Sequence, residues 1–156
     1  MIWGAISYGK KYPLVKIDLN GSTFNGQRYS NEILRPHLSK HLNYLRRYGQ
    51  RHAQAVEDGA KLHWNKSLQS ERAKMRISNL PHPPYSPDLN PIENMWAMLK
   101  CRIRKRSRIP TSEDELWEAI QQAWESIPVE TVNRLINGMP RRAQKVKQAK
   151  GFSTSY

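Results

Sequence analysis

The most constraining feature of the sequence is a proline-rich loop that leads directly into an amphipathic helix. Prolines within 83–87 restrict the approach, and Asn90 followed by Pro91 matches the N-cap and first position of a helix. Glu93 then falls in the first turn. Apolar residues recur at helical spacing and predict one buried helix face: Ile92, Met95, Trp96, Leu99 and Ile103. The pattern therefore predicts a carboxylate held at the start of a helix whose other side packs in a core.

Glu93 has two interpretations. Asn-x-x-Glu is close to a capping box, in which the glutamate bonds back to the N-cap backbone, and first-turn acids also suit the helix dipole. Taken alone, this pattern favours capping. A second acid changes the balance, because Asp58 ends the short segment that begins with the apolar run 53–56, just before a glycine-containing turn. A strand that ends there would present Asp58 at the edge of a sheet.

The acids Asp58 and Glu93, with their spacing and with Ser-Pro-Asp-Leu-Asn-Pro-Ile-Glu-Asn-x-Trp around the second, carry a family resemblance. They resemble the catalytic domain of Tc/mariner-type DDE transposases. The resemblance covers nearly the whole chain. Three further segments resemble the family's Trp-Gly second strand, its Asn-x-x-x-Tyr…Ile-Leu-x-Pro segment and its closing Ile-x-x-Met-Pro-x-Arg: residues 2–7, 25–36 and 136–141.

This resemblance implies an α/β, ribonuclease H-like fold, with a mixed sheet and flanking helices. It also implies metal-dependent DNA cleavage and strand transfer in DNA transposition. Asp58 and Glu93 would be catalytic residues and ligands of Mg²⁺ or Mn²⁺, because hard divalent ions take carboxylate oxygens and neutralise charge during phosphoryl transfer. Asp88 and Glu57 are nearby alternatives. We expect Asp88 to fix its turn, and Glu57 to point to the face opposite Asp58.

Part of the family pattern is absent. Family members carry a first catalytic Asp on a central strand before the Trp-Gly strand, and a helix-turn-helix region before that. Here Met1 directly precedes that strand, so we expect the first, central strand to be missing and the catalysis to be impaired. Unpaired inner strand edges would leave the chain marginally folded, unless another segment or chain closes the gap. Asp18 is one substitute for the lost acid, although a solvated strand residue is the simpler interpretation.

The charge balance points to a polyanionic partner. Lys and Arg number 26 against 13 acidic residues, for a net charge of +13. No apolar segment approaches membrane-spanning length, so DNA is the expected partner and a membrane is not. The predicted nucleic-acid contacts are two basic groups: Lys100, Arg102, Arg104, Lys105, Arg106 and Arg108 in one, and Arg141 and Arg142 in the other. The alternative for the first group is a solvated helix end whose cations suit the dipole.

Several broader expectations follow. The domain organisation is a truncated catalytic domain over 1–140 and a basic C-terminal tail over 141–156. The lone Cys101 excludes an internal disulfide. A hairpin is predicted over 1–19, and a helix over 27–47 that Pro36 kinks or divides. The implied DNA substrate places the protein in the nucleus, and a homo-oligomer is left open.

Two rival functions remain at this point. A non-catalytic nucleic-acid-binding remnant of a transposase would keep the basic surfaces and no longer use the acids. An inert remnant would have no cellular role. DNA binding that survives loss of Asp58 and Glu93 would favour the first, and absence of stable protein would favour the second.

Overall fold

A computed structural model describes residues 1–19, 21–57, 66–83 and 86–149. These residues group into two compact units, and the predicted domain bounds at 1–140 and 141–156 stay a prediction. The first unit consists of Met1 and residues 17–85, and the second of residues 2–16 and 86–156. We describe each unit by itself.

An N-terminal hairpin belongs to the second unit. Strand β1 (Ile2–Trp3) pairs antiparallel with β4 (Val15–Lys16), and β2 (Ile6–Ser7) pairs antiparallel with β3 (Lys10–Lys11). The predicted hairpin is confirmed, but its two ladders are shorter than the predicted strands. The expected absence of a central strand is not tested by these residues.

Gly4 lies between the two ladders and allows the Trp96 side chain to pack closely on the hairpin. A Cβ atom at this position would lie 2.8 Å from a side-chain carbon of Leu14 and 2.8 Å from the indole of Trp96. The missing side chain therefore makes room for Trp96, which stacks on Trp124 with 5.4 Å between ring centroids. The Trp124 indole N–H in turn donates to the Tyr12 carbonyl at 2.9 Å.

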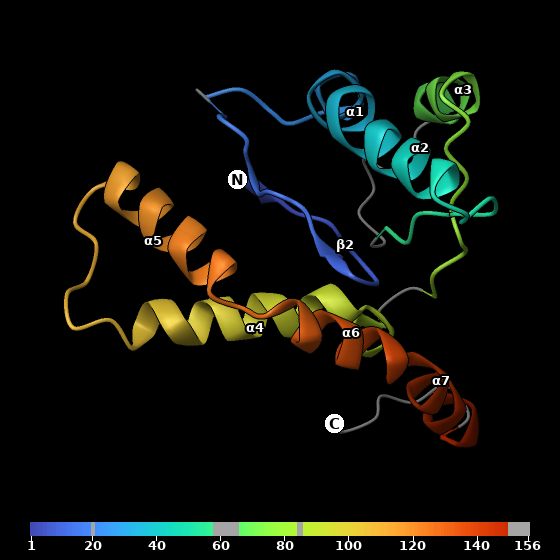
Figure 1. The fold of residues 1–156 in the computed structure, drawn as a ribbon. Helices are drawn as coiled ribbons and strands as arrows, with labels where there is room; N and C mark the ends of the chain where they lie inside the picture. The colour runs from blue at the N-terminus through green and yellow to red at the C-terminus, as the bar shows by residue number, and fades with distance from the viewer. Residues whose placement is uncertain (20, 58–65, 84–85, 150–156) are drawn as a thin grey trace. The chain divides into compact units, whose positions relative to one another are not determined.

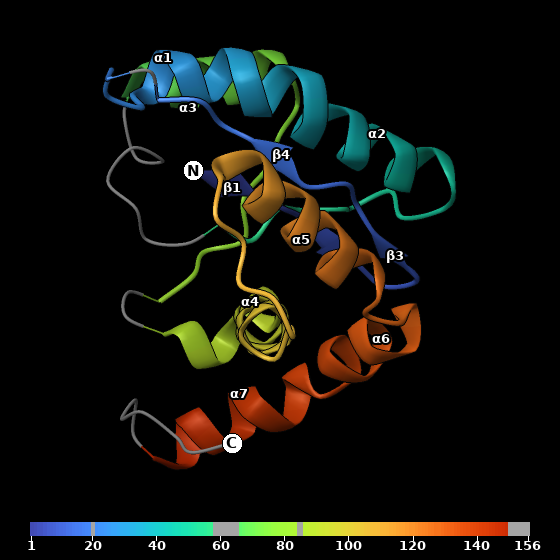
Figure 2. The same cartoon turned by 90° about the vertical axis from the view of Figure 1, so that its left-hand side faces the viewer.

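Four helices complete the second unit: α4 (Pro91–Arg104), α5 (Glu113–Glu125), α6 (Val129–Asn137) and α7 (Met139–Gln148). Figure 2 looks along α4, with α5 and α7 on opposite sides of it. The predicted apolar face of α4 is confirmed, since Met95 and Leu99 are buried. Their core cluster is completed by Ile120, Ala123, Trp124, Ile127 and Val132.

The first unit is built on one long helix, visible in Figure 1 as α1 (Gly26–Tyr29), a π-helical segment η1 (Ser30–Leu38) and α2 (Ser39–Arg47). Pro36 lies inside η1, so the helix is not divided there, and the alternative of a kink stays a prediction. A π-helical segment bonds with a different spacing, and this accommodates a residue that has no N–H to donate.

The remainder of the first unit packs on that helix. Helix α3 (Lys66–Lys74) contacts α1 and η1. Ala55 and Asn79 form a parallel bridge, and Ala55 belongs to the apolar run for which the sequence predicts a strand. The buried apolar side chains of this unit include Tyr29, Ile33, Leu34, Leu38, Leu42, Leu68 and Ile77. Within the residues described in either unit, no helix is long and apolar enough to cross a membrane.

Candidate active site

The turn before α4 is closed by its own backbone. A 3₁₀ turn, η3 (Pro87–Leu89), precedes the helix, and the Asn90 N–H donates to the Pro87 carbonyl at 3.0 Å. The Asn90 side chain accepts from the Ile92 N–H at 3.4 Å, and Pro91 occupies the first helical position. The predicted N-cap is therefore confirmed, and Asn90 is buried within the turn.

The Glu93 carboxylate takes no part in this cap. A capping box would direct its carboxylate to the Asn90 N–H, but that N–H already donates to Pro87. The Glu93 backbone N–H bonds to the Asn90 carbonyl at 3.1 Å, whereas no described residue donates a hydrogen bond to its carboxylate. Glu93 is half-buried at a helix N-terminus. Its oxygens are thus free to take a ligand.

Arg142 of α7 fastens this turn to the start of α4. Its Nη1 donates to the Asn94 side-chain oxygen at 2.7 Å and to the Asp88 carbonyl at 3.3 Å. Asn94 directly follows Glu93, so the guanidinium joins the backbone of the turn before α4 to the side chain of the residue after the candidate ligand. We call Arg142, Asn94 and the Asp88 carbonyl the Arg142 clamp.

Sequence reasoning placed Arg142 among the nucleic-acid contacts and missed the clamp. The residue is half-buried, and one of its guanidinium nitrogens is occupied within the protein. A signal was present in the closing motif Ile-x-x-Met-Pro-x-Arg. Counted from Ile136, that motif puts its arginine at position 142. The neighbouring Arg141 is exposed.

Asp58, the other predicted ligand, lies outside the described residues, but its neighbour Glu57 is described. The Glu57 carboxylate accepts from Arg72 Nη2 at 2.6 Å, from Asn79 Nδ2 at 2.6 Å and from the Tyr29 hydroxyl. The Glu57 and Arg72 side chains are 9% and 8% exposed. Glu57 is thus held by three partners in the first unit and is a poor alternative ligand.

Two other acids were candidates. Asp88 is half-buried, and its backbone carbonyl accepts from Arg142 within the clamp. Asp18 is exposed just after β4. The described residues contain no group of three or more His, Cys, Asp or Glu side chains that could hold a metal ion. Of the two predicted ligands, the structure therefore describes Glu93, whose free carboxylate fits a hard divalent cation.

The eight predicted nucleic-acid contacts form two separate groups. Five are exposed at the end of α4 and in the loop after it: Lys100, Arg104, Lys105, Arg106 and Arg108. Arg102 is half-buried, Arg106 donates to Gln122 at 3.0 Å, and Arg108 pairs with Glu115 at 2.8 Å. Arg141 and Arg142 lie instead on α7, where the clamp holds it against the start of α4. The 14 residues of α4 separate the two groups by roughly 20 Å.

Comparison with known proteins places these features in a family. The family model described as DDE superfamily endonuclease matches residues 1–116. The Tc3 transposase of Caenorhabditis elegans is 31% identical over 156 residues, which are 100% of this chain and 45% of that protein. The Tc1 transposase of the same organism is 29% identical over 100% of this chain and 54% of its own length. The chain thus spans about half the length of these relatives.

Solved structures show the fold. The catalytic domain of Mos1 mariner transposase is similar with a TM-score of 0.77 at 21% identity, covering 99% of this chain and 75% of that chain. Other similar structures are that domain with raltegravir and Mg (TM-score 0.71) and the Mos1 paired-end complex with left transposon end (TM-score 0.68). The raltegravir structure is 21% identical and covers 94% of this chain and 70% of its own. The paired-end complex is 22% identical and covers 92% of this chain and 40% of its own. This likeness supports the predicted α/β, ribonuclease H-like class, and the missing central strand stays a prediction.

Proposed function

The chain belongs to the DDE superfamily endonuclease family, within its Tc/mariner transposases, and on this premise we propose that it serves in metal-dependent DNA cleavage and strand transfer. The observation that carries the proposal is the free carboxylate of Glu93. A cap that closes without it leaves this acid for another role, and the motif that surrounds it is that of the family's catalytic acid.

We assign Asp58 and Glu93 as the residues that would hold Mg²⁺ or Mn²⁺, as the resemblance implies. When bound, such an ion neutralises charge that develops on the phosphodiester oxygens. Glu93 supplies a carboxylate in the first turn of a helix that Asn90 caps and that the Arg142 clamp joins to α7. The Mos1 catalytic domain has been solved with Mg and with Mn, which supports this choice of ion.

For these 156 residues taken by themselves, we propose weak cleavage. Two carboxylates suit one ion, whereas the two-metal arrangement uses ions about 3.5–4 Å apart and a carboxylate that bridges them.

Transposon DNA is the proposed substrate and partner. The net charge of +13 and the exposed cations at the end of α4 suit a phosphate backbone. The Mos1 paired-end complex with left transposon end supports the same choice. We extend the proposal to location in the nucleus, where such DNA lies, and to assembly of identical copies.

The test is nicking of supercoiled DNA by the purified chain in Mg²⁺ or Mn²⁺. We expect weak nicking by the wild type and none by Asp58→Asn or Glu93→Gln, since either change removes a charged metal ligand. Asp88→Asn is the matched control, because it changes an acid five residues from Glu93 that we assign to the turn. It should nick as the wild type does.

The outcome that overturns cleavage is salt-sensitive DNA binding with no metal-dependent nicking. That result would favour the alternative, a nucleic-acid-binding remnant. Nicking that persists in Glu93→Gln but disappears in Asp88→Asn would instead overturn the assignment of the ligand.

A further inference from the structure

A second basic surface, outside the predicted contacts, lies in the first unit at the end of α2. Between Glu32 and Glu57 the sequence contains no acid. The same stretch holds three histidines and five cations: Arg35, Lys40, Arg46, Arg47 and Arg51. Lys40, Arg47 and Arg51 are exposed. A surface with this charge is complementary to a polyanion.

Two exposed tyrosines occupy the same surface. Tyr44 and Tyr48 are four residues apart and therefore neighbours on α2 and its C-cap. Their ring centroids are 4.5 Å apart, with a 42° angle between the ring planes. Their exposed fractions are 44% and 67%. Aromatic rings are usually buried, so a pair of them exposed among cations requires a reason.

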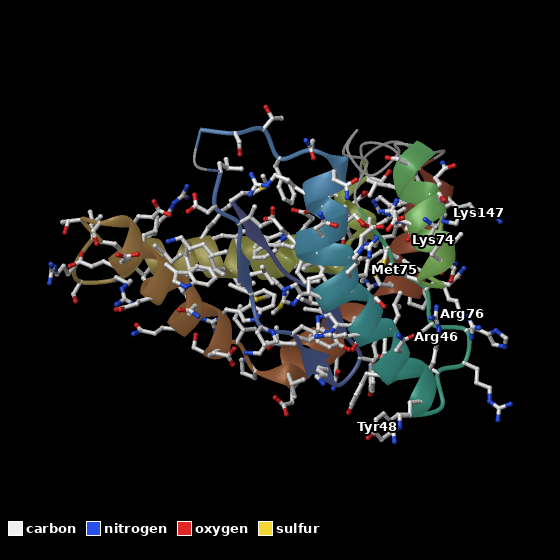
Figure 3. All side chains as sticks on the ribbon, turned by 90° about the horizontal axis from the view of Figure 1, so that it is seen from above. Arg46, Tyr48, Lys74, Met75, Arg76 and Lys147 are labelled. Atoms are coloured by element: carbon white, nitrogen blue, oxygen red, sulfur yellow. The ribbon has the colours of Figure 1, made fainter. Side chains whose placement is uncertain are left out.

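Arg46 joins the end of α2 to other segments of the first unit. It lies between the two tyrosines in the sequence, and its Nη2 donates to the Ala53 carbonyl at 3.2 Å and to the Arg76 carbonyl at 2.7 Å. Figure 3 shows Arg46 beside Arg76, with Tyr48 at the free end of α2. Arg76 has a left-handed backbone (φ 55°), rare for a residue with a side chain, and the bond from Arg46 supports it.

The turn after α2 is also ordered by its own hydrogen bonds. Gly49 adopts φ 100°, which favours glycine, and the Gln50 N–H donates to the Leu45 carbonyl at 2.9 Å. The Tyr48 N–H donates to the Tyr44 carbonyl at 3.2 Å. The tyrosines are therefore held on a fixed backbone, and little ordering is left to oppose binding.

We propose that Tyr44, Tyr48, Arg47 and Arg51 form a binding site for single-stranded nucleic acid, which we call the tyrosine platform. Unpaired bases stack on the tyrosine rings, and the arginines contact the phosphates. In a duplex the bases already stack on each other, so duplex DNA gains only the phosphate contacts. The platform deepens the proposed function and rests on it, because DNA cleavage and strand transfer expose single strands.

The experiment measures binding of fluorescent single-stranded and duplex oligonucleotides by anisotropy, with the full chain. Tyr48→Ala should weaken binding of oligo-dT about tenfold, because one base no longer stacks, and leave duplex binding unchanged. Tyr48→Phe should bind as the wild type does, since it keeps the ring. Tyr8→Ala is the matched control: Tyr8 is 62% exposed but belongs to the hairpin of the second unit.

The arginines are tested by salt. Changing Arg47 and Arg51 together to alanine should lower the slope of log affinity against log salt for oligo-dT by about 0.7 for each phosphate that is no longer neutralised. Oligo-U in place of oligo-dT shows whether the platform prefers RNA or DNA, and preferential binding of either that depends on Tyr48 supports it.

The platform is wrong if Tyr48→Ala leaves single-strand binding unchanged, or if Tyr8→Ala weakens it equally. A loss of duplex and single-strand binding alike in Tyr48→Ala would also overturn it. These results are distinct from failure of the proposed cleavage, which is measured by metal-dependent nicking and does not depend on Tyr48.

Discussion

Two helices of the second unit start with the same pattern and use it differently. Helix α4 starts with Asn90 and carries Glu93 three positions later, and α5 starts with Ser112 and carries Glu115 three positions later. In α5 the Ser112 hydroxyl accepts from the Glu115 N–H at 3.1 Å. The Glu115 carboxylate accepts from the Thr111 N–H at 2.8 Å and from the Thr111 hydroxyl at 3.0 Å.

At α4 the corresponding carboxylate, that of Glu93, accepts no hydrogen bond from the described residues. The Asn90 N–H donates to the Pro87 carbonyl, so the turn itself provides what a capping glutamate would provide. Pro87 contributes to this difference, because it is the first residue of a 3₁₀ turn that ends on the cap. The comparison shows that the role of a first-turn acid depends on what closes the turn before it.

The largest expected loss of stability comes from Glu57, because both of its carboxylate oxygens accept hydrogen bonds. Glu57→Gln leaves Arg72 charged and buried without its carboxylate, so we expect the free energy of unfolding to fall by about 3–5 kcal/mol. Denaturant unfolding followed by circular dichroism measures it. Glu32→Gln is the control, because Glu32 pairs with Arg28 in a far more exposed i,i+4 pair. Its loss should be about 0.5 kcal/mol or less. Equal losses of unfolding free energy in the two variants would show that the hydrogen bonds of Glu57 stabilise the fold no more than the exposed Glu32–Arg28 pair does.

The clamp on the α4 turn should give the next largest effect. Arg142→Met keeps much of the side-chain length but removes the donors to Asn94 and Asp88, and we expect a loss of about 1–2 kcal/mol. Arg141→Met is the matched control on the adjacent, exposed residue. If both variants unfold at the same denaturant concentration, the clamp does not hold the turn.

The two first-turn acids should differ in stability. Glu115→Gln weakens the acceptor for Thr111 and should lower the thermal unfolding midpoint. Glu93→Gln removes no described hydrogen bond, so its effect on the free energy of unfolding should stay within about 0.5 kcal/mol. Differential scanning calorimetry in a single buffer measures the thermal unfolding midpoints of both variants and of the wild type. A larger loss for Glu93→Gln would restore the capping interpretation that the sequence alone favours.

The smallest effect is a pH dependence at α5. Hydrogen bonds from the Thr111 backbone and hydroxyl lower the pKa of the Glu115 carboxyl. A pKa that is lower in the folded state adds stability above the unfolded-state pKa of about 4.3, and this is lost as pH falls through the folded value. Glu115→Gln should therefore flatten the stability profile below that pH, and Glu118→Gln on the same helix is the control. An unchanged profile in Glu115→Gln would contradict the assignment.

Local features were predictable because they depend on neighbours in the chain. The Asn90 cap, Pro91 at the first position and the buried face of α4 all follow from spacing within one helix. The sequence places the start of α5 at Thr111 or Ser112 in the same way, and the structure shows Ser112 as the N-cap. Gly4 was predictable as part of the Trp-Gly motif. The reason that a glycine is needed there is its close approach to Trp96, which only the folded chain shows.

The features that escaped prediction join distant residues. Arg142 and Asn94 are 48 positions apart, and Glu57 and Arg72 are 15 apart, so no periodicity within an element reports either pairing. Sequence reasoning instead assigned Arg142 by its charge. Pro36 shows a different limit, because the helix continues through it as a π-helical segment and does not divide there. The role of Asp58 and the binding of the basic residues to DNA stay predictions.

Thermal unfolding with and without Mn²⁺ shows whether the free carboxylate of Glu93 holds a divalent ion. An ion that binds the folded chain raises its unfolding midpoint. We predict that Mn²⁺ raises the midpoint of the wild type and of Glu115→Gln but not of Glu93→Gln. An equal rise in Glu93→Gln would contradict the claim.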